Sequence, residues 1–187
     1  MKNKFFIFIL PAVILLTGLL SVHTIQAETQ SYQIGDNGPA GGIVFYDKGF
    51  YSSGWRYLEA APEDQSTGTE WGCHGQNVPG DQGASIGSGY SNTLEIIRAC
   101  GKNTSAAKIA AQYRGGDKSD WYLPSKDELK ALYENLHKAG KGNFSRYGYW
   151  SSTEDNAKLA WYHGFLTGNQ KKFNKYNSSR VRAIRAF

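Results

Sequence analysis

The sequence predicts an α+β fold in which antiparallel strands combine with two to three helices and long irregular loops. Runs rich in branched and aromatic residues, typical of strands, stand toward both ends of the chain. Apolar residues recur at helical spacing only in the middle. Residues 63–91 are dominated by glycine, serine, asparagine and proline. Their apolar residues show neither the spacing of a helix nor the alternation of a strand. Strands kept apart from helices in this way indicate α+β organisation.

Two strands are expected to open the folded region. The run "GIVFYD" (42–47) is typical of a strand, and it follows glycines and a proline that favour tight bends. "KGFYSSG" (48–54) resembles the tip of a hairpin, and "WRYLEAAP" (55–62) is its return strand. A proline cannot donate to a ladder, so we expect this strand to end at Pro62.

The stretch over 63–91 is long for a loop inside a compact domain, and such loops are usually functional or disordered. Trp71 and a tether at Cys73 argue against disorder. Two helices are expected after it. Asn92 or Thr93 caps a helix that runs through about residue 100, and "SAAKIAAQYR" (105–114) carries apolar residues on one face.

The most specific local signal is "SDWYLPSKDELKALYENL" (119–136). It predicts a short strand over 120–123 that Pro124 terminates. Ser125 followed three residues later by Glu128 predicts a capping box at the start of a helix. The buried stripe of that helix consists of Leu129, Leu132, Tyr133 and Leu136. The segment 119–136 therefore predicts a strand that is held at a fixed angle to a helix and has a structural role.

The last part of the chain predicts a series of antiparallel strands. "LAWYHGFL" and "KKFNKY" flank the turn "TGNQ" and together indicate a hairpin. One strand precedes this hairpin and one closes the chain. The expected strands lie over 147–154, 159–166, 171–176 and 181–187.

The N-terminus carries the pattern of a secretory signal peptide. Lys2 and Lys4 precede an apolar run over 5–20, and a polar stretch then leads to Ala27. We therefore expect a signal peptide over 1–27 and a single domain over 28–187 that is secreted, displayed on the cell surface or periplasmic. An uncleaved N-terminal anchor is the alternative. No later segment is apolar enough to cross a membrane.

The sequence contains two cysteines, Cys73 and Cys100. In an exported chain they have one possible intramolecular pairing, so we expect a disulfide between them. Closing a loop of about 27 residues contributes roughly 3 kcal/mol to stability. Two separate buried thiols are the alternative.

The distribution of charge is more informative than its sum. With Lys2 and Lys4 set aside, 19 basic and 16 acidic residues leave a balance of +3. Residues 156–187 contain seven lysines and arginines and no acidic residue, a balance of +7, whereas residues 28–155 have a balance of −4. One end of the domain is therefore expected to be a source of positive charge.

Five motifs together resemble the Lcl C-terminal domain family, a domain found at the end of a bacterial collagen-like adhesin and long described as a domain of unknown function. They are "IGDNGPAGGIVFYD", "GWRYLEAAP", "DWYLPSKDELKALYENL", "YWSSTE" and "VRAIRAF". The resemblance implies a C-type-lectin-like fold with paired terminal strands. It also implies a surface or secreted domain that binds sulfated glycosaminoglycans. The chain has no collagen-like stalk, so avidity from a stalk-built trimer is not assumed.

The acid-free C-terminal region is the leading candidate for a binding site. Alternate residues of a strand share a face, so its lysines are expected to form a row that sulfates or other anions bridge. Arginines add forked hydrogen bonds, and a tyrosine offers a ring for stacking. The candidate residues are Lys171, Lys172, Lys175, Tyr176, Arg180, Arg182 and, in the irregular loop, Trp71. Protection of an exposed strand edge and general solubility are the alternatives.

Other chemistries have weaker support. The histidines and cysteines lack zinc-ligand spacing, the calcium-dependent lectin signatures are absent, and no cofactor motif occurs. Neighbouring carboxylates point apart on a strand or helix, which disfavours the third interpretation, a hydrolase. The main alternative is an envelope protein-interaction or structural domain that uses residues 63–91. We expect no catalysis, no metal and no nucleic-acid partner, and the sequence is compatible with a homo-oligomer.

Overall fold

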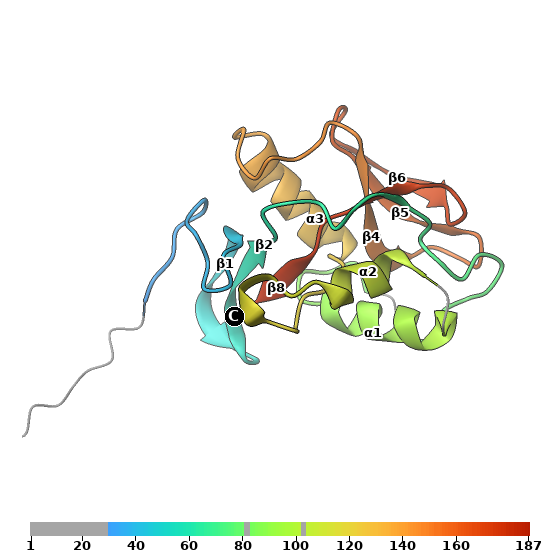
Figure 1. Ribbon diagram of the computed structural model, residues 1–187, viewed down its shortest axis with the longest axis horizontal. Helices are drawn as coiled ribbons and strands as arrows, with labels where there is room; N and C mark the ends of the chain where they lie inside the picture. The colour runs from blue at the N-terminus through green and yellow to red at the C-terminus, as the bar shows by residue number, and fades with distance from the viewer. Residues whose placement is uncertain (1–29, 81–82, 102–103) are drawn as a thin grey trace, which may run out of the picture. The chain divides into compact units, whose positions relative to one another are not determined.

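The computed structural model describes residues 30–80, 83–101 and 104–187 (Figure 1). The chain divides into Met1–Gln30 and a compact unit over Ser31–Phe187. The predicted signal peptide over 1–27 lies outside the described residues. Within them the fold is α+β, with three α-helices and eight strands in two sheets, as the sequence predicts. None of the described helices combines the length and hydrophobicity that a membrane crossing requires.

The first sheet joins the two ends of the folded unit. Its strands lie in the order β1, β2, β8, and both pairs are antiparallel (Figure 1). The last strand therefore pairs with the second strand and not with the first. The bounds are β1 Ile43–Ser52, β2 Trp55–Ala60 and β8 Ile184–Ala186.

The second sheet has five strands in the order β3, β7, β4, β5, β6. The pairs are antiparallel except for β4 and β7, which run parallel. β6 forms an edge of this sheet, and its exposed Lys171 and Lys172 are the kind of residue that protects an edge strand from pairing with another chain. The bounds are β3 Ser66–Thr69, β4 Gly148–Glu154, β5 Leu159–Gly164, β6 Asn169–Asn174 and β7 Ser179–Val181.

The three helices are α1 Gly89–Cys100, α2 Ala106–Gln112 and α3 Lys126–Leu132. The predicted capping box at α3 is confirmed, because Ser125 Oγ accepts from the Glu128 amide while the Glu128 carboxylate accepts from the Ser125 amide. A π-helical turn over Tyr133–His137 extends α3, and a 3₁₀ turn over Gly115–Asp117 follows α2.

Two strand predictions are wrong in part. The expected strand over 120–123 is a single bridge, in which Tyr122 and Ile184 exchange backbone hydrogen bonds of 2.9 Å. The expected strand over 181–187 is divided between β7 and β8. It divides because Arg182 and Ala183 both bond to the backbone of Ala61, which carries the chain from one sheet to the other. The irregular region over 63–91 also contains β3.

The interior consists of two packed clusters. One surrounds three indole rings, those of Trp71, Trp121 and Trp150, and receives the alanine face of α2. The other lies between the first sheet and the leucine stripe of α3. Large aromatic side chains bury the most apolar area, so these rings contribute strongly to stability.

The predicted disulfide is confirmed, and Cys73 and Cys100 close a loop with a sequence separation of 27. It ties the irregular loop to the end of α1. We expect the double variant C73S/C100S to lose about 3 kcal/mol of unfolding free energy, because the unfolded chain regains the entropy of that loop. Urea unfolding of both proteins measures the difference. A loss below about 1 kcal/mol would contradict a stabilising crosslink.

His163 makes stability depend on pH. Its side chain is buried against the rings of Tyr133 and Phe165, and neither ring nitrogen forms a hydrogen bond of ordinary geometry within the described residues. Burial lowers the pKa of His163 from 6.5 to about 4. The unfolded chain therefore binds a proton more readily, and the stability that the neutral ring provides above pH 6.5 is lost as the pH falls toward 4.

We expect the His163→Phe variant to show a smaller fall in melting temperature between pH 7 and pH 4.5, by about 5 °C. Differential scanning calorimetry across this range measures the effect. The exposed His74, changed to Gln, is the matched control and leaves the slope of the wild type unchanged. Equal slopes for His163→Phe and the wild type would show that another group controls the acid response.

Candidate functional site

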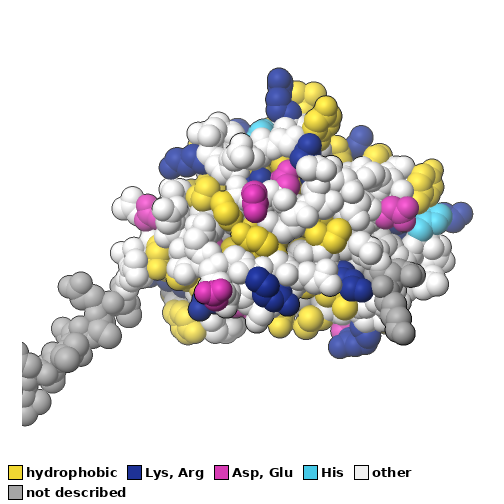
Figure 2. Space-filling view, in the orientation of Figure 1, with side chains coloured by type: hydrophobic (Ala, Val, Ile, Leu, Met, Phe, Trp, Pro, Cys, Tyr) yellow, Lys and Arg dark blue, Asp and Glu magenta, His cyan; other side chains and the backbone are white. Residues whose placement is uncertain are grey.

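The predicted row of free cations on the C-terminal strands does not form, because carboxylates from earlier in the chain neutralise most of its members. Lys172 pairs with Asp155 at 2.7 Å, and Lys175 pairs with Glu154. The remaining predicted arginines, Arg180 and Arg182, share a carboxylate described below. On the face shown in Figure 2, Lys and Arg side chains stand apart, with acidic side chains among them.

Lys175 and Trp71 support the fold instead of facing a ligand. Both side chains are fully buried, and the Lys175 ammonium lies 4.5 Å from the centre of a Trp71 ring. Burial lowers the pKa of Lys175, and its ammonium donates to Glu154 and to the Gln76 carbonyl. The Trp71 indole donates to the Ser151 carbonyl at 2.7 Å. The two residues therefore fix the irregular loop to the second sheet.

Arg182 is likewise a structural residue. It is 1% exposed, and its five N–H donors all have acceptors. Two donate to Asp64, at 2.8 and 2.7 Å, and the others to backbone carbonyls of Ala61, Gly142 and Asn143. None of these donors remains for a ligand.

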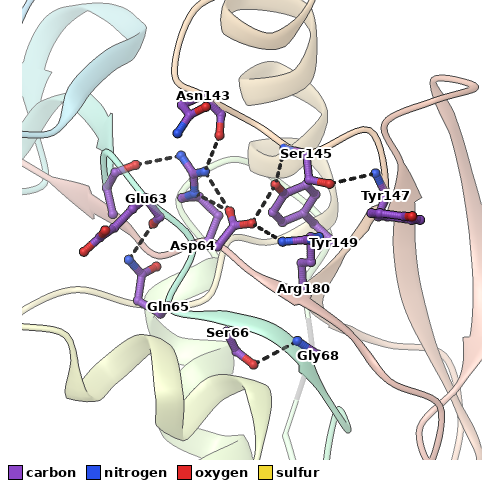
Figure 3. Close-up of polar contacts among 12 residues, drawn as sticks. Glu63, Asp64, Gln65, Ser66, Gly68, Asn143, Ser145, Tyr147, Tyr149 and Arg180 are labelled. Atoms are coloured by element: carbon purple, nitrogen blue, oxygen red, sulfur yellow. Dashed lines mark hydrogen bonds and ion pairs between the residues drawn. The ribbon is translucent and has the colours of Figure 1, made fainter.

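The Asp64 carboxylate is the centre of this network (Figure 3). It accepts from Arg182, from Arg180 Nη1 at 2.9 Å and from the Tyr149 hydroxyl at 3.1 Å. Burial raises the pKa of Tyr149 to about 12, so this hydroxyl is a neutral donor at physiological pH. Two guanidinium groups share one carboxylate, which leaves one surplus positive charge.

The surplus charge lies on the side of Arg180, because Arg182 is enclosed. The side chain of Arg180 is 20% exposed, and its Nη1 is the atom that contacts Asp64. Its Nε is buried and has no hydrogen-bond partner among the described residues. The ring of Tyr147, which is 73% exposed, lies 5.3 Å from the guanidinium carbon. Figure 3 shows Arg180 between Asp64 and the Tyr147 side of the network.

Arg180 borders a hollow of about 290 Å³, here called the Arg180 pocket. Its aromatic lining is tightly packed, since a Cβ on Gly148 would lie 1.8 Å from the ring of Tyr162. Only glycine lets that ring cross the strand so closely. The pocket is lined by Thr67, Tyr147, Gly148, Tyr162, Phe173, Ser178, Ser179 and Arg180. It therefore combines three aromatic rings, three hydroxyl side chains and one guanidinium.

One further cation lies near this pocket. The ammonium of Lys171 is 5.4 Å from the ring centres of Tyr162 and Phe173, which both line the pocket. The exposed Arg146 precedes Tyr147 in the chain, but its charge acts on His137 and it does not line the pocket. Within the described part of the chain, Lys171 does not lie in ion-pair distance of a carboxylate.

A family model described as the Lcl C-terminal domain matches residues 61–185. The chain belongs to the Lcl C-terminal domain family. The matched residues of this Lcl C-terminal domain include the Asp64 network and every residue that lines the Arg180 pocket. A search of curated proteins finds no match to the chain.

The structure of this Lcl C-terminal domain brings together two of the predicted site residues, Lys171 and Arg180. Tyr176 is exposed but contacts His74, with ring centres 5.1 Å apart, and it does not line the pocket. Periodicity did not predict that Tyr147 lines this pocket, and it placed Tyr162 only in the alternation of a strand. The available signal was the segment "YGYW" at 147–150, where a glycine separates two tyrosines.

The irregular region over 63–91 is attached to the body of this Lcl C-terminal domain at several points. Besides Trp71, the Val78 amide donates to Glu154, and the Gly83 carbonyl accepts from Asn92 and Thr153. These bonds hold the region as part of the scaffold. No cluster of three or more metal-ligating side chains occurs among the described residues.

We expect Lys175→Ala to destabilise the domain by about 3–5 kcal/mol, because it leaves the Glu154 carboxylate without its cation in the interior. Urea unfolding measures the change. Lys158→Ala removes an exposed lysine that forms no ion pair within the described residues, and as the matched control it changes stability by about 0.5 kcal/mol or less. A loss below about 1 kcal/mol for Lys175→Ala would show that this lysine does not support the fold.

Proposed function

We propose that this Lcl C-terminal domain is an exported, non-catalytic module that binds anionic polysaccharide in the Arg180 pocket. The observation that carries the proposal is the sharing of one carboxylate, Asp64, by two guanidinium groups next to a hollow lined with aromatic rings. The proposal keeps the ligand class that the sequence predicts and moves its site from a lysine row to a pocket.

Electrostatics favour a negative ligand at this pocket. The Asp64 network carries a surplus positive charge on the side of Arg180, and the unpaired Lys171 lies over two of the lining rings. Charged hydrogen bonds from a guanidinium to an anion are roughly twice as strong as neutral ones. An anionic group at the mouth of the pocket therefore gains interactions that a neutral group does not.

The remaining lining suits a sugar. Tyrosine rings present an apolar face together with a polar hydroxyl, and they are enriched where one side of a contact is apolar and the other is wet. The hydroxyls of Thr67, Ser178 and Ser179 both donate and accept hydrogen bonds, as sugar hydroxyl groups require. Pockets of this kind combine an apolar lining with a few polar groups that fix the orientation of a ligand.

Export is supported by two features. The N-terminal pattern over 1–27 is typical of a signal peptide, and the disulfide between Cys73 and Cys100 is of a kind that persists in oxidising compartments. The proposed location is therefore outside the cytoplasm, as a secreted, cell-surface or periplasmic domain.

A binding role is favoured over hydrolysis because the Asp64 carboxylate is already occupied by hydrogen bonds within the protein. A second hollow, of about 460 Å³, has two carboxylates, Glu63 and Asp64, in its lining. Both oxygens of Asp64 are already engaged by guanidinium groups and by Tyr149. This carboxylate is therefore poorly placed to exchange protons with a substrate.

We expect Tyr147→Ala and Lys171→Gln each to weaken heparin binding about fivefold, which corresponds to about 1 kcal/mol. Tyr147→Ala removes an exposed ring at the pocket, and Lys171→Gln removes an unpaired charge beside it. Biolayer interferometry with immobilised heparin at two salt concentrations measures both effects. Binding must weaken with salt, because exposed charges are screened over about 10 Å at 0.1 M.

The matched controls are Tyr176→Ala, which removes an exposed tyrosine outside the pocket, and Lys130→Gln, which removes an exposed lysine on α3. Both are expected to bind heparin as the wild type does. If all four variants lose affinity equally, binding follows net charge and surface aromatics, and the pocket has no special role.

A further inference from the structure

We infer that the Arg180 pocket recognises a single carboxylate-bearing sugar unit, a uronic acid, in preference to densely sulfated stretches of a polysaccharide. The inference rests on the proposed function and specifies the chemistry of the ligand at the same site. It follows from the size of the pocket, from the geometry of its one guanidinium and from the pairing of the lysines around it.

The size of the pocket limits the ligand to one sugar. Its volume of about 290 Å³ is just below the range of about 300–1,000 Å³ that is typical of small-molecule sites. The rings of Tyr162 and Phe173, whose centres lie 5.0 Å apart, form one wall. A pocket of this size accommodates one ring of a polysaccharide, and the rest of the chain passes over the surface.

The guanidinium of Arg180 presents one face for a planar anion. Nη1 is occupied by Asp64, whereas Nε has no partner and Nη2 has none among the described residues. These two nitrogens form the side-on fork that matches the two oxygens of a carboxylate. A buried donor without an acceptor is uncommon and needs an explanation. A ligand carboxylate supplies the missing acceptor.

Tyr147 lies beside this fork. Nε is covered in the structure, and the Tyr147 ring lies beside the guanidinium while remaining largely exposed. The backbone amide of Tyr147 donates to Ser145 Oγ, but its ring forms no hydrogen bond within the described residues. A sugar that packs against this exposed ring therefore breaks no hydrogen bond of the ring among the described residues, and it lies beside the guanidinium.

The surroundings do not suit a dense polysulfate. Such a polymer requires several free cations spaced along its length. Here the neighbouring Lys172 is paired with Asp155, and Lys175 is buried with Glu154. Lys171 remains beside the pocket as a cation that forms no ion pair within the described residues. This moderate charge matches a polymer with about one carboxylate per repeating unit.

The test compares three forms of one polymer at constant ionic strength. Heparin, desulfated heparin, which keeps its uronic acids, and carboxyl-reduced heparin, which keeps its sulfates, are titrated into the wild type by isothermal calorimetry. We expect the dissociation constant for carboxyl-reduced heparin to be at least tenfold higher than that for desulfated heparin. Carboxyl-reduced heparin binding as tightly as desulfated heparin, or more tightly, overturns the inference and leaves the proposed function intact.

The second pair of probes consists of polymers that contain no sulfate. Polygalacturonate is expected to bind, and its fully methyl-esterified form, in which each carboxylate is neutral, is expected to bind at least tenfold more weakly. Arg180→Lys, which keeps the positive charge and loses the two-nitrogen fork, should remove this preference, whereas Tyr176→Ala should keep it. Equal binding of the two polymers overturns the inference. Failure of every heparin form and of polygalacturonate to bind overturns the proposed function as well.

Discussion

The bond network around the Asp64 carboxylate is the interaction on which the rest of the structure depends. It joins the segment after β2 to β7, and through Arg182 and Tyr149 it also holds the loop before β4. Arg182 stands where the chain passes from the second sheet to the first, so the same bonds set the path of the last strands. Without Asp64, two guanidinium groups would lie in or near the interior without a counter-charge, which is a severe cost. Because one carboxylate serves two cations, stability of the fold and positive potential at the Arg180 pocket have a common origin.

Most of the basic residues in the last part of the chain form ion pairs with acidic residues of the earlier part. The acidic earlier part of the domain and the basic last part meet through Glu154 with Lys175, Asp155 with Lys172, and Asp64 with both arginines. Arg185 repeats the pattern, since it bonds to both Glu59 and Asp120. Desolvation raises the pKa of Glu59, which also accepts from the amides of Ala40 and Gly42 and so fixes the glycine-rich turn before β1. Of the seven cations over 156–187, Lys158 and Lys171 form no ion pair within the described residues, and Lys171 and Arg180 adjoin aromatic rings.

Local features were predictable from the sequence, and long-range pairings were not. The capping box at Ser125 and the hairpin of β5 and β6 depend on residues a few positions apart. The capping box occurs as predicted, and the hairpin occurs with its strands ending and beginning two residues earlier than predicted, at Gly164 and Asn169. The partners of Arg182 and Trp71 lie 118 and 80 positions away, so periodicity gave no sign that these side chains are buried. Alternation along a strand assigned lysines to an exposed face without showing which of them meet a carboxylate. For the same reason the sequence identified Lys171 and Arg180 as candidates but not Tyr147, whose role depends on its place beside Arg180.

The central claim is that the surplus charge of the Asp64 network acts on a ligand at the Arg180 pocket. The most direct measurement is a titration of ¹⁵N-labelled protein with a defined uronic-acid trisaccharide, followed by the backbone amides and by the arginine Nε–H resonances in two-dimensional NMR spectra. We predict the largest shifts at the Nε–H of Arg180 and at the amides of Tyr147 and Gly148, with Arg182 Nε–H nearly unchanged. Shifts centred instead on the exposed Phe50 and Tyr51 of the β1–β2 hairpin, or on His74 and Tyr176, with Arg180 unaffected, would contradict it.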